Sequence, residues 1–179
     1  MEKALFEYHG VSQAIYCRDL LLKYCSRVFL SCRKDQEPLF PGQQYQKIYD
    51  HKEYSGIGPL GGVLSAMDEY PQASWLVLAC DMPFVKEATI SHIIQSRDSD
   101  KEATVYVSEN GFIEPLCALY EASIRPRLNN FFKNKNYSLN KILLSSAIKT
   151  IKPVRTDELM NINDPEEAQK ISRVLRETK

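Results

Sequence analysis

The stretch Trp75-Leu76-Val77-Leu78-Ala79-Cys80-Asp81-Met82-Pro83 decides the fold class of this chain. An unbroken run of apolar residues is followed at once by the carboxylate of Asp81. Strands with one face in water alternate apolar and polar residues, whereas continuously apolar strands are typical of parallel sheets covered by helices on both faces. The stretch therefore predicts a buried strand of an α/β protein, with a polar residue at its carboxyl end.

Segments of helical and strand character alternate on both sides of this strand. Apolar residues at helical spacing predict helices over 11–25, from Gly58-Pro59 onward, over 87–96, over 123–132 and over 138–144. Further strands are expected over 28–30, 47–50, 104–107, 112–120 and 148–154. Pro115 cannot donate to a strand ladder, so it assigns the strand over 112–120 to an edge or a bulge. The pattern predicts one α/β domain over residues 1–179, with a mostly parallel sheet.

The last helix has the clearest start signal. Asp164 is expected to cap it, Pro165 suits its first position, and Glu167 is placed to close a capping box. The apolar residues then predicted to face the core are Ala168, Ile171, Val174 and Leu175.

Composition and charge exclude several classes of protein. The chain has 179 residues, enough for one domain, and 23 basic residues balance 23 acidic ones. A neutral chain has no general basic surface for nucleic acid or an anionic membrane, although a local basic patch is compatible with this balance. No basic region leads an apolar stretch and no apolar run approaches the length of a bilayer span. We therefore expect a cytoplasmic protein without nucleic-acid or membrane partners.

The five cysteines show no metal-binding spacing. Each lies in or beside an apolar run, where a small buried side chain is the better interpretation than a reactive thiol. An odd number of unpaired cysteines favours a reducing compartment.

Asp81 is the first candidate for a functional residue. Ligands of open α/β sheets bind outside the carboxyl ends of the strands, so a carboxylate at that position suggests a metal or phosphate-linked role. Asp before a proline-containing turn is also a common cap, and from spacing alone the two interpretations are equally supported.

Two loops are further candidates. The glycines of Gly56-Ile57-Gly58-Pro59-Leu60-Gly61-Gly62 allow close approach of a ligand, and the helix that starts at Pro59 directs free amides to the same place. The alternative is a loop with glycines for helix packing, and neither the dinucleotide fingerprint nor the P-loop is matched. In Asn161-Ile162-Asn163, an extended backbone directs both amides to one side, toward an oxygen-rich ligand or the waters of a hard cation. Turn and cap chemistry is the simpler interpretation there.

Five motifs in order resemble those of the molybdenum cofactor guanylyltransferase (MobA) family. They are Glu2-Lys3-Ala4-Leu5, Gly58-Pro59-Leu60-Gly61-Gly62, Leu78-Ala79-Cys80-Asp81-Met82-Pro83, Glu114-Pro115-Leu116-Cys117-Ala118-Leu119-Tyr120 and Asn161-Ile162-Asn163-Asp164-Pro165-Glu166. The resemblance implies a Rossmann-like nucleotidyltransferase fold, a three-layer α/β/α arrangement with a mostly parallel sheet. It also implies transfer of GMP from GTP to molybdopterin, with release of pyrophosphate and with Mg²⁺ as cofactor.

The resemblance also assigns residues to roles. Asp81 would hold Mg²⁺ and Lys3 would contact the triphosphate, which makes these two the catalytic residues. The nucleotide-binding residues would be Lys3, Ser31, Asp50, Gly58, Pro59, Leu60, Gly61 and Asp81. The acceptor-binding residues would be Glu114, Pro115, Leu116, Asn161 and Asn163.

The chain departs from the family pattern in two places. Ser31 stands where the family has an asparagine that contacts the nucleotide, and serine is shorter. Family members also begin with a strand and a glycine-rich phosphate loop before the lysine, and this sequence starts at Glu2-Lys3. The resemblance therefore predicts a fold without its first strand and loop, with impaired GTP binding, and a chain that dimerises, recruits another segment or is unstable.

Two alternatives to GMP transfer are open at this point. A related nucleotidyltransferase could use CTP or another phosphorylated acceptor. A non-catalytic module could keep the scaffold to bind molybdopterin or a partner protein.

Overall fold

The structure, a computed structural model, describes residues 2–155 and 157–177. Contacts group these residues into two compact units. Unit 1 contains the residues up to Val28, Leu78–His92 and the residues from Pro153 onward, and unit 2 contains Phe29–Val77 and Ile93–Lys152. A single domain over residues 1–179 stays a prediction.

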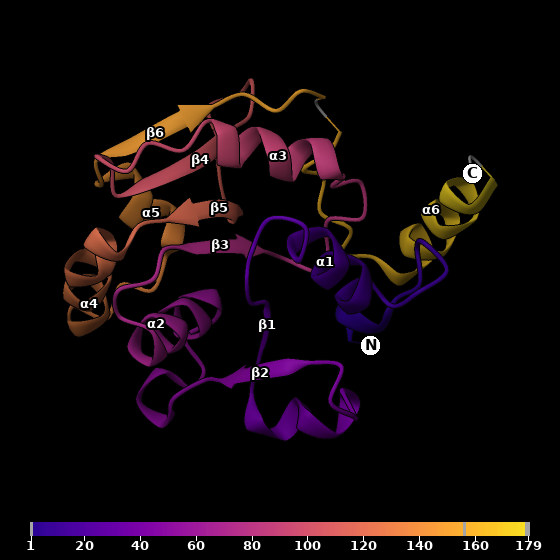
Figure 1. Ribbon diagram of the computed structural model, residues 1–179, viewed down its shortest axis with the longest axis horizontal. Helices are drawn as coiled ribbons and strands as arrows, with labels where there is room; N and C mark the ends of the chain where they lie inside the picture. Colours follow the sequence, from indigo (N-terminus) through magenta and orange to yellow (C-terminus); the bar gives the residue numbers. More distant parts are fainter. Residues whose placement is uncertain (1, 156, 178–179) are drawn as a thin grey trace. The chain divides into compact units, whose positions relative to one another are not determined.

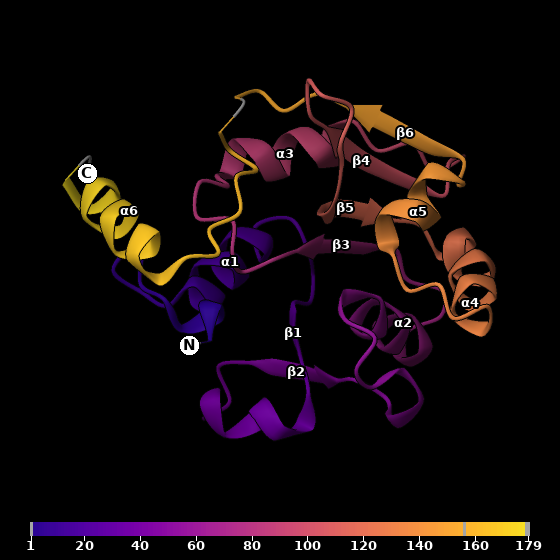
Figure 2. The same cartoon turned by 180° about the vertical axis from the view of Figure 1, so that it is seen from behind.

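A four-stranded mixed sheet forms the centre of unit 2. Its strands are hydrogen-bonded in the order β3 (Trp75–Leu78), β5 (Ile113–Tyr120), β4 (Ala103–Val107) and β6 (Ile148–Ile151), and the same order is visible from both sides in Figures 1 and 2. β4 runs parallel to β6 and antiparallel to β5. The strand predicted from the apolar run is confirmed, but β3 is half-buried rather than buried. The reason is its position at the edge of this sheet, where one side lacks a neighbouring strand among the described residues.

β5 meets the expectation drawn from Pro115 through a bulge and not through an edge position. The strand lies between β3 and β4, so it is not an edge strand. The predicted bulge is present, because Val105 of β4 pairs with Ala118 whereas the next residue, Tyr106, pairs with Glu114. The register with β4 therefore skips residues 115–117, which is how the sheet accommodates a proline in an interior strand.

A second, two-stranded sheet belongs to the same unit. β1 (Phe29–Cys32) and β2 (Gln46–Tyr49) pair in parallel and are connected through the 3₁₀ helix η2 (Lys34–Leu39). Both strands contact helix α2 (Pro59–Glu69), which follows the 3₁₀ helix η3 (Lys52–Tyr54). In the part of the chain that the structure describes, neither strand pairs with the four-stranded sheet.

α2 supplies much of the core of unit 2. Pro59 stands at its start, as predicted, since a proline at the first helical position removes an amide that would have no partner. The predicted apolar stripe is confirmed, because Leu60, Val63, Leu64 and Met67 are all buried. They pack in one cluster with residues of β4 and β5 and with buried residues of α4 (Arg125–Lys133) and α5 (Leu139–Leu144), two helices that the sequence also predicted. A short 3₁₀ helix, η4 (Ala122–Ile124), precedes α4.

Unit 1 is built from loops and helices. Its elements are the 3₁₀ helix η1 (Lys3–Leu5), α1 (Gln13–Leu21), the first part of α3 (Glu87–Gln95) and α6 (Pro165–Glu177). A small core joins Tyr8, Ile162 and Ala168, with Phe84 packed against it. The carboxylate of Asp164 accepts the amides of Glu166 and Glu167 at 2.7 and 3.3 Å, which confirms the predicted cap of α6.

One predicted core position of α6 is wrong. Ala168 is buried, and Ile171 and Leu175 pack against the core, but Val174 is 59% exposed. The core of unit 1 is small, so it buries only part of the apolar stripe of α6 and leaves Val174 outside.

The cysteines agree with their interpretation as packing residues. None of the five forms a disulfide among the described residues, and Cys17, Cys32 and Cys117 are buried while the other two are half-buried. Among the described residues, no helix combines the length and the apolar character that crossing a membrane would require.

Candidate active site

Asp81 lies in unit 1, in the loop that follows β3. Its main-chain carbonyl accepts the amide of Ile162 at 2.8 Å, which ties this loop to the segment before α6. One carboxylate oxygen, Oδ2, pairs with Nζ of Lys3 at 3.0 Å. The other, Oδ1, is buried and has no hydrogen-bond partner among the described residues. A buried carboxylate oxygen without a donor is costly, and a bound cation would remove that cost.

Lys3 brings a third predicted residue to Asp81. Its ammonium group also donates to Oδ1 of Asn163. Burial alternates around Asn163, since Ile162 is 2% exposed in the core while Asn161 and Asn163 are exposed. Unit 1 therefore assembles a carboxylate, an ammonium group and an amide from three distant parts of the sequence.

Three side chains hold the loop after Asp81, and none of them is among the residues predicted from the sequence. Gln13 Nε2 donates to the carbonyl of Met82 at 3.3 Å, and the hydroxyl of Tyr16 donates to that of Val85 at 3.1 Å. His9 Nε2 lies 2.9 Å from the carbonyl oxygen of Pro83 and donates to it, since a carbonyl only accepts. We call His9, Gln13 and Tyr16 the carbonyl clamp.

The clamp residues are themselves held in place by packing. The rings of His9 and Tyr16 stack with their centroids 3.7 Å apart, and Gln13 is fully buried. Gln13 lies one helical turn before Cys17 on the inner side of α1. Gln13 is a polar residue on an otherwise apolar helix face, and this is the feature of the sequence that could have indicated a buried hydrogen bond.

Tyr8 contributes to the electrostatics of unit 1. Burial raises the pKa of its phenol, and the negative charges of Asp81 and Glu167 raise it further. Tyr8 is therefore neutral at physiological pH. The group around Asp81 then offers one carboxylate oxygen to a cation, beside an ammonium group that is 43% exposed and able to meet phosphate oxygens.

The glycine loop before α2 lies in unit 2. Gly58 has a positive φ of 70° at the N-cap of the helix, a conformation that favours glycine. Gly61 is packed so closely that a Cβ built on it would lie 2.5 Å from the main-chain oxygen of Tyr54. Leu60 points into the core and is fully buried.

Ser31, Asp50 and Gly62 meet beside this loop. A Cβ on Gly62 would lie 2.5 Å from Oγ of Ser31 and 3.7 Å from Oδ1 of Asp50. Ser31 is on β1 and Asp50 directly follows β2, so two parallel strands carry these residues to the same edge. Burial raises the pKa of the Asp50 carboxyl, and the positive charges of Arg33 and His51 oppose that shift. A half-buried carboxylate here is an acceptor for N–H donors of a ligand.

The remaining predicted residues lie in the bulge of β5. Glu114 accepts the amide of Leu116 at 2.9 Å, and the carbonyl of Pro115 accepts the hydroxyl of Tyr120 at 2.8 Å. The bulge is thus held by hydrogen bonds of its own. The roles of Glu114, Pro115 and Leu116 stay predictions.

Comparison with known proteins assigns the chain to a family. The family model that matches is described as the MobA-like NTP transferase domain, and it covers residues 1–171, which include parts of both units. A relative from Synechocystis sp., named molybdenum cofactor biosynthesis bifunctional protein, is 35% identical over 175 residues, covering 96% of this chain and 49% of that protein. The chain thus spans about half the length of this relative.

Two further proteins are similar. The molybdenum cofactor guanylyltransferase of Pseudomonas entomophila is 25% identical over 170 residues, which cover 92% of this chain and 86% of that protein. The crystal structure of molybdopterin-guanine dinucleotide biosynthesis protein A from Archaeoglobus fulgidus superimposes with a TM-score of 0.76 at 21% identity, covering 99% of this chain and 92% of that one. This likeness confirms the nucleotidyltransferase-like α/β fold.

Proposed function

Because this chain belongs to the family of MobA-like NTP transferase domains, we propose that it is a molybdenum cofactor guanylyltransferase, which transfers GMP from GTP to molybdopterin and releases pyrophosphate. The names of the relatives support GTP and molybdopterin as substrates. The observation that carries the proposal is the buried, unpartnered Oδ1 of Asp81 next to the ammonium group of Lys3. Such a pair suits a cation that is itself bound to phosphates.

Mg²⁺ would be held by Asp81. Mg²⁺ takes oxygen ligands and is commonly bound through one or two carboxylates together with substrate phosphates. When bound, the ion would neutralise charge on the phosphates of the nucleotide. Lys3 already faces the same carboxylate and would bind phosphate oxygens beside it.

Residues of unit 2 would bind GTP. The carboxylate of Asp50 would accept an N–H donor of the nucleotide, and its half-buried position makes that hydrogen bond stronger than one in water. The amides at the start of α2, exposed by Gly58 and Pro59, would face negative charge favourably. Ser31, Leu60 and Gly61 would shape this part of the site.

Within unit 1, Asn161 and Asn163 would bind the acceptor. The acceptor-binding roles of Glu114, Pro115 and Leu116 rest on the family resemblance alone. The terminal phosphate of the acceptor is already ionised, so the reaction needs little proton transfer. Catalysis would come from positioning and charge neutralisation, as in other phosphoryl and nucleotidyl transfers.

Pyrophosphate release tests the proposal. The full chain is incubated with molybdopterin, Mg²⁺ and either GTP or CTP, and Asp81→Asn is compared with Asp100→Asn, a variant at an exposed turn. We expect GTP-dependent release that falls by roughly 100-fold or more in Asp81→Asn and is unchanged in Asp100→Asn. Faster turnover with CTP than with GTP would show that CTP is the donor. Full activity of Asp81→Asn would contradict the proposal that Asp81 holds the metal. Binding of molybdopterin without turnover of either nucleotide would favour a non-catalytic module.

A further inference from the structure

One segment of unit 2 has a charge unlike that of the whole chain. Residues 122–152 contain seven basic residues and no acidic one, although basic and acidic residues balance over the full sequence. The seven are Arg125, Arg127, Lys133, Lys135, Lys141, Lys149 and Lys152. The remainder of the chain therefore has an excess of acidic residues, and the molecule carries a local basic segment despite its neutral balance.

Carboxylates from elsewhere neutralise only the two arginines. Arg125 pairs with Asp68 at 2.5 Å, and Arg127 pairs with Glu102 at 3.0 Å. The five lysines have no carboxylate partner within 4.0 Å among the described residues. Positive charge without an internal partner therefore accumulates on this segment.

Three of these lysines belong to one helical hairpin. Lys133 ends α4, Lys135 lies in the turn and Lys141 lies on α5, and all three are exposed. The opposite side of the hairpin is anchored in the core by Leu128, and by Leu139, Ile142 and Leu143 of α5. α4 and α5 contact each other and lie side by side in Figures 1 and 2. The lysines thus occupy the outer surface of a well-anchored hairpin.

Apolar side chains are exposed on the same hairpin. Leu144 at the end of α5 is 67% exposed, and Tyr137 in the turn is 38% exposed. Tyr137 is held in place, since its ring lies 6.2 Å from that of Phe132. We call Lys133, Lys135, Tyr137, Lys141 and Leu144 the hairpin surface.

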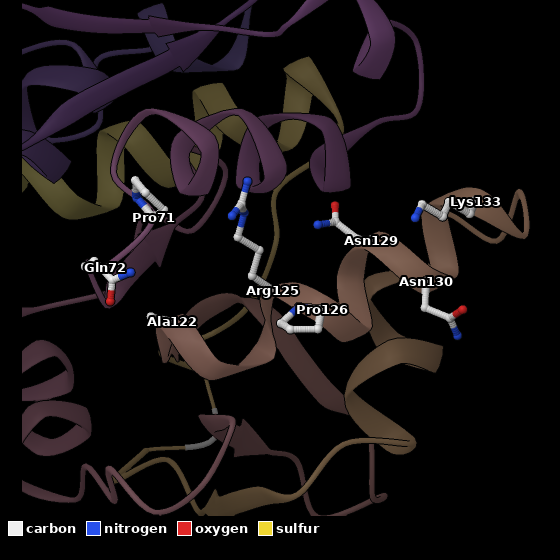
Figure 3. A pocket seen from close by; sticks show the side chains of 8 residues that line it. All are labelled: Pro71, Gln72, Ala122, Arg125, Pro126, Asn129, Asn130 and Lys133. Atoms are coloured by element: carbon white, nitrogen blue, oxygen red, sulfur yellow. The ribbon is translucent and has the colours of Figure 1, made fainter.

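A groove of about 560 Å³ continues this surface along α4. Figure 3 shows Arg125, Asn129 and Lys133 in succession along the helix, with Asn130 beside them and Pro71 and Gln72 across from the N-terminal part of α4. No carboxylate lines the groove among the described residues. Because Arg125 is paired with Asp68, Lys133 supplies the available positive charge of the groove, and the amides of Gln72, Asn129 and Asn130 add further donors. This set suits carboxylates and peptide carbonyls.

We propose that the hairpin surface and the groove together form the docking site of an acidic segment of a partner protein. Carboxylates of that segment would meet Lys133, Lys135 and Lys141, and its backbone would follow the amides of the groove. The exposed Leu144 favours a protein over a nucleic acid, because protein interfaces surround apolar anchors with a polar rim. The proposal is independent of the transfer reaction, since it uses no residue of the candidate active site.

Binding of a model peptide tests the docking site. The probe is a fluorescent twelve-residue peptide of glutamates with one central leucine, titrated against the full chain at low salt and at 0.15 M salt. The test variant is Lys133→Glu/Lys141→Glu, and Lys135 is left intact because its φ of 55° makes substitution there a backbone change. Lys101→Glu/Lys170→Glu, at two exposed positions outside the hairpin, is the control with the same change in net charge.

We expect binding at low salt that weakens with salt, and a roughly tenfold loss of affinity in Lys133→Glu/Lys141→Glu but not in the control. Leu144→Ser should lower peptide affinity about threefold and leave any affinity for DNA unchanged. Equal losses in both lysine variants, or no binding by the unmodified chain, would overturn the proposal. Tighter binding of a single-stranded oligonucleotide than of the peptide, through the same lysines, would make the surface a nucleic-acid site instead.

Discussion

The Asp81 loop of unit 1 and the glycine loop of unit 2 are both candidate parts of the active site, but different interactions hold them. Side chains hold the first, since the carbonyl clamp donates to the main chain of residues 82, 83 and 85. Backbone packing holds the second, because Gly61 lies too close to Tyr54 for any side chain. A substitution in the clamp removes one hydrogen bond and leaves the others in place. A side chain added at Gly61 forces the packed backbone itself to move. The two should therefore respond differently to substitution.

The largest effect on stability is expected for Gly61→Ala. The added Cβ would meet the main-chain oxygen of Tyr54 at 2.5 Å, so backbone has to move, and we expect a loss of about 2–3 kcal/mol in the free energy of unfolding. Thermal or urea unfolding measures it. Gly62→Ala is the matched control, since its Cβ would meet only the Ser31 hydroxyl, which Ser31→Ala removes. Similar losses for both glycine variants, without relief from Ser31→Ala, would contradict the backbone explanation.

A smaller effect is expected for Gln13→Leu in the clamp. The substitution keeps the volume but leaves the carbonyl of Met82 without its donor in a buried place, which should cost about 1–2 kcal/mol. Because the loop carries Asp81, the concentration of Mg²⁺ needed for half-maximal turnover should also rise a few-fold. Gln13→Met, which also keeps the volume without the donor, should behave like Gln13→Leu. A change in stability without any change in metal dependence would make Gln13 a packing residue only.

Tyr16→Phe should have the next smaller effect. It removes one hydroxyl that is only partly buried and keeps the ring stack with His9, so a loss of about 1 kcal/mol is expected in chemical unfolding. His9→Phe keeps a ring for the stack and removes the donor to Pro83. If each single variant lost as much stability as the double variant, the clamp would act as one unit rather than as separate hydrogen bonds.

The smallest effect is expected for Asp50→Asn, and its sign is opposite. Burial raises the pKa of this carboxyl, so folding disfavours its charged form. The stability of the unmodified chain is therefore highest, with respect to Asp50, below the pKa of the unfolded state and decreases as pH rises through the folded pKa. Asp50→Asn should be more stable by less than about 1 kcal/mol at pH 7 and show no gain at pH 3. Chemical unfolding at both pH values measures this difference. A lower free energy of unfolding of Asp50→Asn at pH 7 would show that the Asp50 carboxylate has a stabilising partner. The affinity for GTP should fall in the same variant.

The sequence predicted the elements around the candidate site well. The helix start at Gly58-Pro59 and the strand before Asp81 depend on local rules, proline at a first helical position and an apolar run, and both are present. The local rule for Pro115 left an edge and a bulge open, and the sheet order decided for the bulge, since the strand is interior. The prediction failed at Val174, which is exposed because the small core of unit 1 does not cover that part of α6.

The clamp was not predictable because its acceptors are main-chain carbonyls. Every residue has a carbonyl, so no side-chain pattern identifies those of residues 82, 83 and 85 as partners of His9, Gln13 and Tyr16. Only Gln13, polar on an apolar helix face, left a trace in the sequence. The hairpin surface is an intermediate case. The sequence shows that its residues are basic, but only the folded structure shows that its lysines have no carboxylate partner among the described residues.

The order of elements, the family motifs and the charged residues are all readable from the chain, because periodicity, turn chemistry and composition are properties of the sequence. Which of those charges are neutralised depends on the fold. Lys3 meets Asp81 and Asn163, Arg125 meets Asp68, and Lys133 and Lys141 meet no carboxylate among the described residues. The physical reason is that an ion pair requires the two charged groups to lie within about 4 Å, so it depends on the folded positions of residues far apart in the sequence.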